Sequence, residues 1–87
     1  MARYRKKPVV VDAIQWRGDN LDEVREFLGF NPITGPTGAL MLYTLEGVIT
    51  ASPNDWIIKG VQDEFYPCKP DIFEQTYEAV EDGTENH

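Results

Sequence analysis

The sequence predicts a small α+β domain, a mostly antiparallel sheet of about five strands with one main helix at residues 20–28 and a short second helix at 71–76. Three observations predict this class. Apolar residues alternate with period two near the start of the chain and again after residue 38, helical spacing is confined to the two short stretches, and turn residues separate the later strands. With 87 residues, 41% of them hydrophobic, the chain suits one domain at 1–80, followed by an acidic tail at 81–87 that we expect to be disordered.

The first strand is expected in KPVVVDAIQW, residues 7–16. Val9 and Val11 fall on one face, and Val10 and Ile14 fall on the other. Because both faces are fairly apolar, we expect this strand to lie in the centre of the sheet.

The main helix follows in GDNLDEVREFLG. Asn20 is the candidate N-cap, Glu23 completes a capping-box pattern three residues later, and Gly29 is the expected C-terminal stop. Between them the apolar residues recur at helical spacing: Leu21, Val24, Phe27 and Leu28.

Downstream of this helix the pattern predicts a loop and then a four-strand meander. Residues 30–38, FNPITGPTG, hold two prolines and two glycines and are expected to form a loop, with a lid as an alternative role. Glu46–Gly47 is the expected tight reversal, and Pro53 suits a type I turn at SPND, residues 52–55. A third turn is expected at Gln62–Asp63. The strands are expected at 39–45, 48–52, 56–61 and 64–68.

The last structured part is expected to be the short helix at 71–76, where Asp71 and Glu74 repeat the capping-box pattern. Phe73 and Tyr77, four residues apart, share one helical face. We expect residues 76–80 to be extended, as a candidate partner for the first strand.

Charge and composition exclude several classes of protein. The net charge is −7, yet five of the eight Lys and Arg residues lie in the first 17 positions. This overall acidity makes a general nucleic-acid binder unexpected. The basic run RYRKK is explained either as a solvated strand end that protects a sheet edge or as a local anion-binding patch. No membrane span or signal peptide is expected, so we predict a cytoplasmic protein.

No catalytic constellation is recognisable, so we predict a protein that is not an enzyme and needs no cofactor. One cysteine, Cys68, and one histidine, His87, are too few for a structural zinc site. Lys69 beside Cys68 could lower the thiol pKa, but a small packed thiol is the simpler interpretation. The glycines of TGPTG lack the Lys-Ser/Thr ending of a phosphate-binding loop.

The segment DWIIKGVQDEFYPCKPDIF, residues 55–73, is unusually aromatic and has two interpretations. Its rings are either the core of a small domain or the wall of a ligand pocket. In the second interpretation the lysines and the N-terminal basic residues supply the charge that a nucleotide-like anion requires. The candidate ligand-binding residues are Arg3, Arg5, Lys7, Trp56, Lys59, Tyr66 and Lys69.

The opening YRKKPVVVDAIQW and the closing SPNDWIIKGVQDEFYPCKPDIFEQTYE together resemble a family of short phage and prophage proteins over roughly residues 3–78. The resemblance implies a viral origin and a role in the cytoplasm of an infected bacterium, and it brings no established reaction or catalytic residues. Together with the pocket chemistry, it suggests a homo-oligomeric, non-enzymatic protein that sequesters a nucleotide-derived immune signal of the host.

Two further interpretations stay open. One is a module that docks a host protein and uses its acidic residues as a decoy for a basic surface. The other is a minor virion or morphogenesis component. The acidic residues of the first alternative are Glu74, Glu78, Glu81, Asp82 and Glu85.

Overall fold

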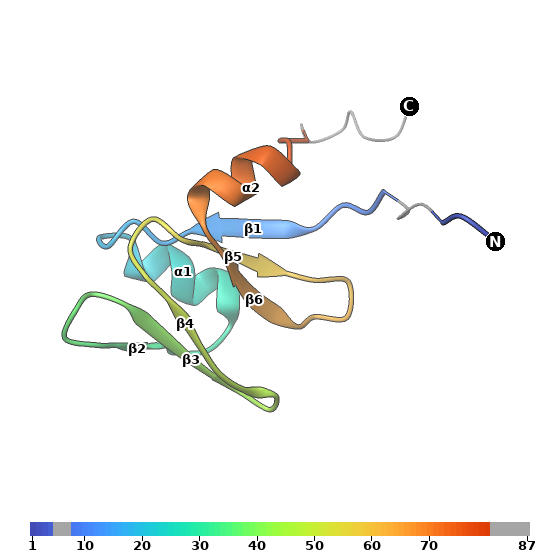
Figure 1. Cartoon of the computed structure of the whole chain (residues 1–87). Coiled ribbons are helices and arrows are strands. Elements are labelled where there is room, and N and C mark those ends of the chain that lie inside the picture. Colours follow the sequence, from blue (N-terminus) through green and yellow to red (C-terminus); the bar gives the residue numbers. More distant parts are fainter. Residues whose placement is uncertain (5–7, 81–87) are drawn as a thin grey trace.

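Two three-stranded antiparallel sheets and two helices form the α+β fold in the computed structural model, which describes residues 1–4 and 8–80 (Figure 1). The six strands of this part of the chain exceed the five or so that the sequence predicts. The first sheet has the order β1-β5-β6 and the second has the order β2-β3-β4. The elements are β1 (Asp12–Gln15), α1 (Leu21–Leu28), β2 (Ile33–Thr34), β3 (Leu40–Thr44), β4 (Gly47–Ala51), β5 (Trp56–Lys59), β6 (Phe65–Cys68) and α2 (Pro70–Thr76).

The first strand lies at an edge of its sheet, so the prediction of a central strand is wrong. Within the described residues β1 pairs with β5 alone, with Ala13 opposite Ile58, and β5 in turn pairs with β6. The ladder begins at Asp12, and the preceding valines Val9 and Val10 are 55% and 65% exposed. The apolar run therefore extends beyond the strand onto the surface.

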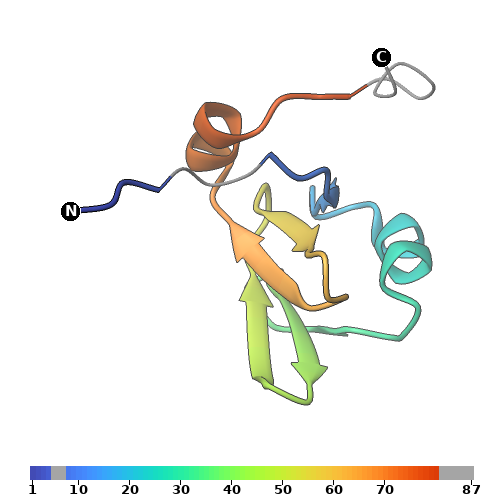
Figure 2. The same cartoon turned by 90° about the vertical axis from the view of Figure 1, so that its right-hand side faces the viewer.

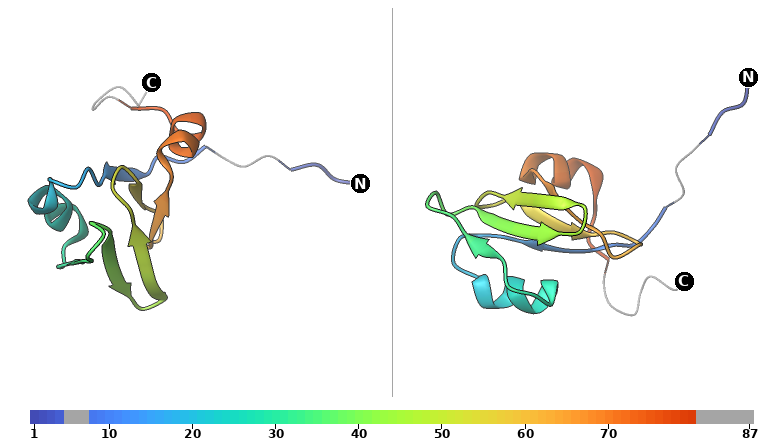
Figure 3. Two further views of the ribbon diagram at one scale, coloured as in Figure 1. Left: turned by 60° about the vertical axis from the view of Figure 1, so that its left-hand side comes forward. Right: turned by 90° about the horizontal axis from the view of Figure 1, so that it is seen from below.

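The predicted meander is divided between the two sheets. β3 pairs with β4 and β5 pairs with β6, but the turn at residues 52–55 carries the chain from the second sheet to the first. This turn is tied to the end of β1, because the amide of Trp16 donates to the carbonyl of Asp55 over 2.9 Å. The two hairpins consequently form two sheets (Figure 3).

The turn between β3 and β4 is Leu45–Glu46, one residue earlier than predicted. Gly47 is already in β4, opposite Thr44, and has a φ of 129° that favours glycine. The Thr44 hydroxyl donates to the Gly47 carbonyl over 2.7 Å and fixes this end of the hairpin.

Residues 30–38 are not simply a loop, because they contain β2, which pairs with β3. The Trp16 indole N–H donates to the Gly38 carbonyl over 2.8 Å and holds the end of this segment against the core. An open lid is therefore a poor description of it. The main hydrophobic core joins α1 to both sheets and consists of Trp16, Val24, Leu28, Leu40, Leu42, Ala51 and Ile57.

Helix α1 has the predicted boundaries but not the predicted cap. Asn20 precedes it, and Gly29 ends it with a left-handed φ of 83°. The Asn20 side chain accepts from no backbone N–H of the helix: its amide donates to the Gln15 carbonyl and to the Glu23 carboxylate, and its oxygen accepts from the Arg17 amide. The hydrogen bond from Asn20, assisted by Arg17, lowers the pKa of Glu23.

Replacing Asn20 by alanine is expected to lower the free energy of unfolding by about 1 kcal/mol, because the Gln15 carbonyl and the Arg17 amide lose their partner. Urea denaturation measures this change. Asp19→Ala is the control, since the Asp19 side chain makes no hydrogen bond within the described residues. Equal stability of the two variants would contradict the assigned role of Asn20.

Helix α2 begins at Pro70, one residue before the predicted start, and Pro70 occupies its first turn. Asp71 accepts from the Ile72 amide instead of capping the helix. Residues 77–80 leave the helix in extended form, with no strand ladder to β1 among the described residues. They pass above the segment that leads into β1 (Figure 2). Within the described part of the chain, no helix is long and apolar enough to span a bilayer.

Candidate functional site

The strand register assigns each residue of the first sheet to one of its two faces. Alternation along β5 separates Trp56 and Ile58 from Ile57 and Lys59. Ile57 belongs to the main core, so its face is called the core face. The opposite face, called the outer face, carries Trp56, Ile58, Tyr66 and Cys68 together with Ala13 and Gln15.

Helix α2 and the residue that follows it, Tyr77, contribute two aromatic rings beside the outer face. Phe73 stacks on Trp56, with ring centroids 4.0 Å apart and planes 4° from parallel. Tyr77 stacks on Phe73 at 5.0 Å and 25°. The three rings form a continuous stack from the sheet to the end of α2, which the predicted i, i+4 spacing of Phe73 and Tyr77 anticipates.

The predicted site residues are only partly brought together. Trp56 and Tyr66 share the outer face, whereas Lys59 belongs to the core face and pairs with Asp63 at 3.7 Å. Arg3 lies on the exposed N-terminal segment, which extends away from both sheets (Figure 3). Arg5 and Lys7 fall outside the described residues.

Lys69 has a local partner, which the sequence does not reveal. Its ammonium lies 3.3 Å and 3.2 Å from the two carboxylate oxygens of Asp55, a side chain that is almost completely buried. The same carboxylate accepts from the Ser52 amide at 3.0 Å. Lys69 therefore compensates a buried charge at the turn between the sheets.

A groove of about 840 Å³ lies beside the aromatic stack. One wall is the segment 8–13, which runs into β1, and the other is formed by residues 76–80. Trp56 and Phe73 line it between these walls. We call this feature the β1 groove.

The walls of the β1 groove are apolar with two acidic groups. Val9, Val10 and Val80 line it and are all substantially exposed. Asp12 and Glu78 are its charged residues, and no lysine or arginine lines it among the residues that the structure describes. Such a lining favours an apolar ligand that carries positive charge.

Tyr66, on the outer face, has a strongly perturbed phenol. Burial and the neighbouring Tyr77 raise the pKa of Tyr66 to about 12. Burial, followed by the charges of Asp55 and Asp71, also raises the pKa of the Cys68 thiol. The thiolate is therefore disfavoured at neutral pH, in agreement with a packed thiol rather than one activated by Lys69. Within residues 1–4 and 8–80, no cluster of side chains could hold a metal ion.

Because the folded state keeps Tyr66 protonated above the ordinary tyrosine pKa, its contribution to stability is complete below about pH 10 and is lost as the pH rises towards 12. Ultraviolet absorbance titration is expected to resolve one of the four tyrosines with a pKa of about 12. Tyr66→Phe should remove this late transition. Ionisation of all four near the ordinary value would contradict the burial of this phenol.

Sequence reasoning missed most of the groove lining. The run of three valines at 9–11 was a signal for part of this lining. Because successive side chains of a strand point to opposite faces, one buried face does not account for all three. The exposure of this run could not be foreseen without knowing that β1 is an edge strand. The lining residues that the pocket interpretation did not name include Val9, Val10, Asp12, Glu78 and Val80.

No family model, curated protein or solved structure matches the chain. The resemblance to short phage proteins stays a prediction.

Proposed function

We propose that this chain is a protein-binding module whose β1 groove takes an extended, apolar and basic segment of a partner protein. The observation that carries the proposal is the position of the groove, between an edge strand and the extended residues 77–80. This agrees with the expectation of a docking module better than with that of an anion pocket.

Edge geometry supports an extended ligand. β1 has one strand neighbour, so the backbone groups on its other side make no ladder among the described residues. A peptide can add to such an edge as a new strand, with main-chain hydrogen bonds for affinity and side-chain contacts for specificity. Six wall residues, 8–13, span about 20 Å when extended, enough for a segment of similar length.

The side chains define which segment fits. Along an added strand every second side chain points to the same face, and on the outer face it meets Trp56 and the exposed valines. Asp12 and Glu78 add negative charge to the groove. Alternating apolar and basic residues match this lining.

The second candidate is a protein that sequesters a nucleotide-derived small molecule, the role suggested by the phage resemblance. The aromatic lining of the groove, Trp56 and Phe73 with Tyr77, favours this candidate. The two carboxylates disfavour it, because they repel phosphate. Its cationic partners would have to come from the N-terminal basic run.

Charge removal separates the two candidates because the expected signs are opposite. We expect Asp12→Asn combined with Glu78→Gln to weaken binding of an octapeptide of alternating valine and lysine by about 2- to 30-fold, since each of the two exposed ion pairs contributes about 0.2 to 1 kcal/mol. If the second candidate is correct, the same variant should instead bind mono- and dinucleotides more tightly than wild type. Isothermal titration calorimetry measures both.

Two controls sharpen the comparison. Val9→Lys introduces a positive charge into the groove wall, which repels the lysines of the peptide, and Val48→Lys makes the same change at a valine of nearly equal exposure in β4. Only Val9→Lys is expected to weaken binding of the valine–lysine peptide. Equal peptide affinity of wild type, the neutralised variant and Val9→Lys would overturn the proposal, and tighter nucleotide binding by the neutralised variant would favour the second candidate.

A further inference from the structure

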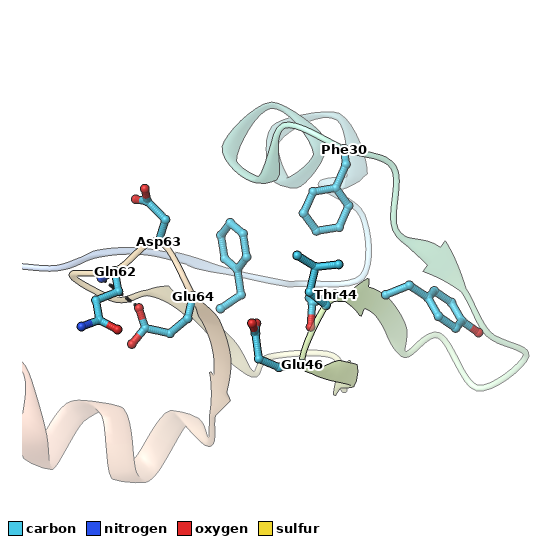
Figure 4. A pocket seen from close by; sticks show the side chains of 9 residues that line it. Phe30, Thr44, Glu46, Gln62, Asp63 and Glu64 are labelled. Atoms are coloured by element: carbon cyan, nitrogen blue, oxygen red, sulfur yellow. Dashed lines mark hydrogen bonds between the residues drawn. The ribbon is translucent and has the colours of Figure 1, made fainter.

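A second hollow lies between the ends of the two hairpins, away from the β1 groove. It has a volume of about 720 Å³ and is bounded by the β3–β4 turn, the β5–β6 turn and Phe30 (Figure 4). We call it the hairpin cleft. Its lining residues are Phe30, Tyr43, Thr44, Leu45, Glu46, Gln62, Asp63, Glu64 and Phe65.

The cleft combines a rigid aromatic wall with exposed apolar side chains. Phe65 meets Phe30 edge-on at 5.9 Å and Phe27 edge-on at 6.1 Å, so two other rings pack against it. In Figure 4 the Phe30 ring points towards Thr44. Tyr43 and Leu45 are largely or fully exposed. An aromatic and a cationic side chain would both find suitable contacts here.

The acidic groups of the cleft differ in how well they are neutralised. Asp63 pairs with Lys59, and Glu64 accepts from the Gln62 amide at 3.0 Å. Glu46 has no ion-pair partner among residues 1–4 and 8–80. No lysine or arginine in the described part of the chain lines the cleft. Glu46 is therefore the charge most available to a basic partner.

The start of the same chain has the complementary chemistry. Met1, Arg3 and Tyr4 are exposed, Tyr4 to 94%, and this segment extends away from both sheets (Figures 1 and 3). It therefore presents an aromatic ring and a guanidinium on neighbouring residues, and Arg3 has no ion-pair partner among residues 1–4 and 8–80. The residues that follow in the sequence, Arg5 to Lys7, are basic as well.

We propose that the hairpin cleft receives the N-terminal segment of a second copy of this chain, with Arg3 near Glu46 and Tyr4 against the aromatic wall. Two different surfaces meet in such a contact, so the association is head to tail and forms rings or open chains rather than a two-fold dimer. Charge attraction contributes to it, and it weakens as ionic strength rises.

Sedimentation velocity over a wide concentration range tests this proposal, with any purification tag at the C-terminus. Wild type is expected to self-associate at low salt and to dissociate at high salt. Arg3→Glu and Glu46→Lys should each remove the association, whereas Glu26→Lys, the same charge change on the exposed face of α1, should retain it.

Charge exchange provides the specific readout. The double variant Arg3→Glu/Glu46→Lys restores opposite charges across the contact and should associate again. An equimolar mixture of the two single variants should also associate, because the wild-type arm of one variant meets the wild-type cleft of the other and the exchanged charges at the remaining ends are opposite as well. A wild type that stays monomeric at every concentration, or single variants that associate like wild type, would overturn the proposal.

Discussion

Replacing Ile58 by alanine is expected to lower the free energy of unfolding by about 2 to 5 kcal/mol, the cost of deleting a buried isoleucine side chain beyond Cβ and leaving a cavity. Ile58 is completely buried, yet it is not part of the main core. Its cross-strand neighbours are Ala13 and Tyr66, on the outer face. The buried state of Ile58 therefore requires that α2 and its aromatic stack cover this face.

Chemical denaturation measures the effect, and Ile72→Ala is the matched control. Ile72 lies on α2 and is 52% exposed, so its truncation should change stability by no more than about 0.5 kcal/mol. If Ile58→Ala does not fold, Ile58→Val should still cost about 0.5 to 1.5 kcal/mol. Similar small effects at both positions would mean that the outer face is open.

Replacing Asp55 by alanine is expected to cost about 1 to 3 kcal/mol, because the Ser52 amide loses its acceptor and Lys69 loses its counter-charge. Asp55 is the one buried charged residue in the described part of the chain. It joins the turn that leads from the second sheet to the first with the segment that leads into α2. Its loss should therefore loosen both connections.

The comparison with Lys69→Ala separates the two halves of this ion pair. The Lys69 side chain is 61% exposed, so water can replace part of its contribution, and its removal should cost less than that of Asp55. Urea denaturation of both variants measures the difference. A larger loss for Lys69→Ala, or an unchanged stability for Asp55→Ala, would contradict the role of Asp55 as the organising residue.

Local signals in the sequence predicted α1 and the hairpins well. Gly29 ends α1 because the left-handed conformation there suits glycine, and the turn near Glu46 brings β3 and β4 together. The position of β1 depended instead on which strands flank β5. Nothing in the residues of β1 itself distinguishes an edge strand with exposed valines before it from a buried central strand.

The candidate site was predictable only as a set of residue types. The aromatic character of residues 55–73 indicated a pocket wall as one of two interpretations, and Trp56 and Phe73 both line the β1 groove. The position of Lys69 depends on a tertiary contact that the sequence does not show. Its ion pair is with Asp55, which lies in the turn between the two sheets. The strand register likewise places Lys59 and Tyr66 on opposite faces of the first sheet. The sequence alone allowed both residues, on the adjacent strands β5 and β6, to lie on one face.

The most direct test of the β1 groove as a peptide-binding site is amide chemical-shift mapping by NMR on the isotope-labelled protein, titrated with the valine–lysine octapeptide. We expect the largest shifts at residues 9–13 and at the Trp56 indole, together with slower amide exchange along the segment before β1, because strand addition gives these groups new hydrogen bonds. Shifts confined to the hairpin cleft at residues 44–46 and 62–64, or no saturable shifts at all, would contradict it.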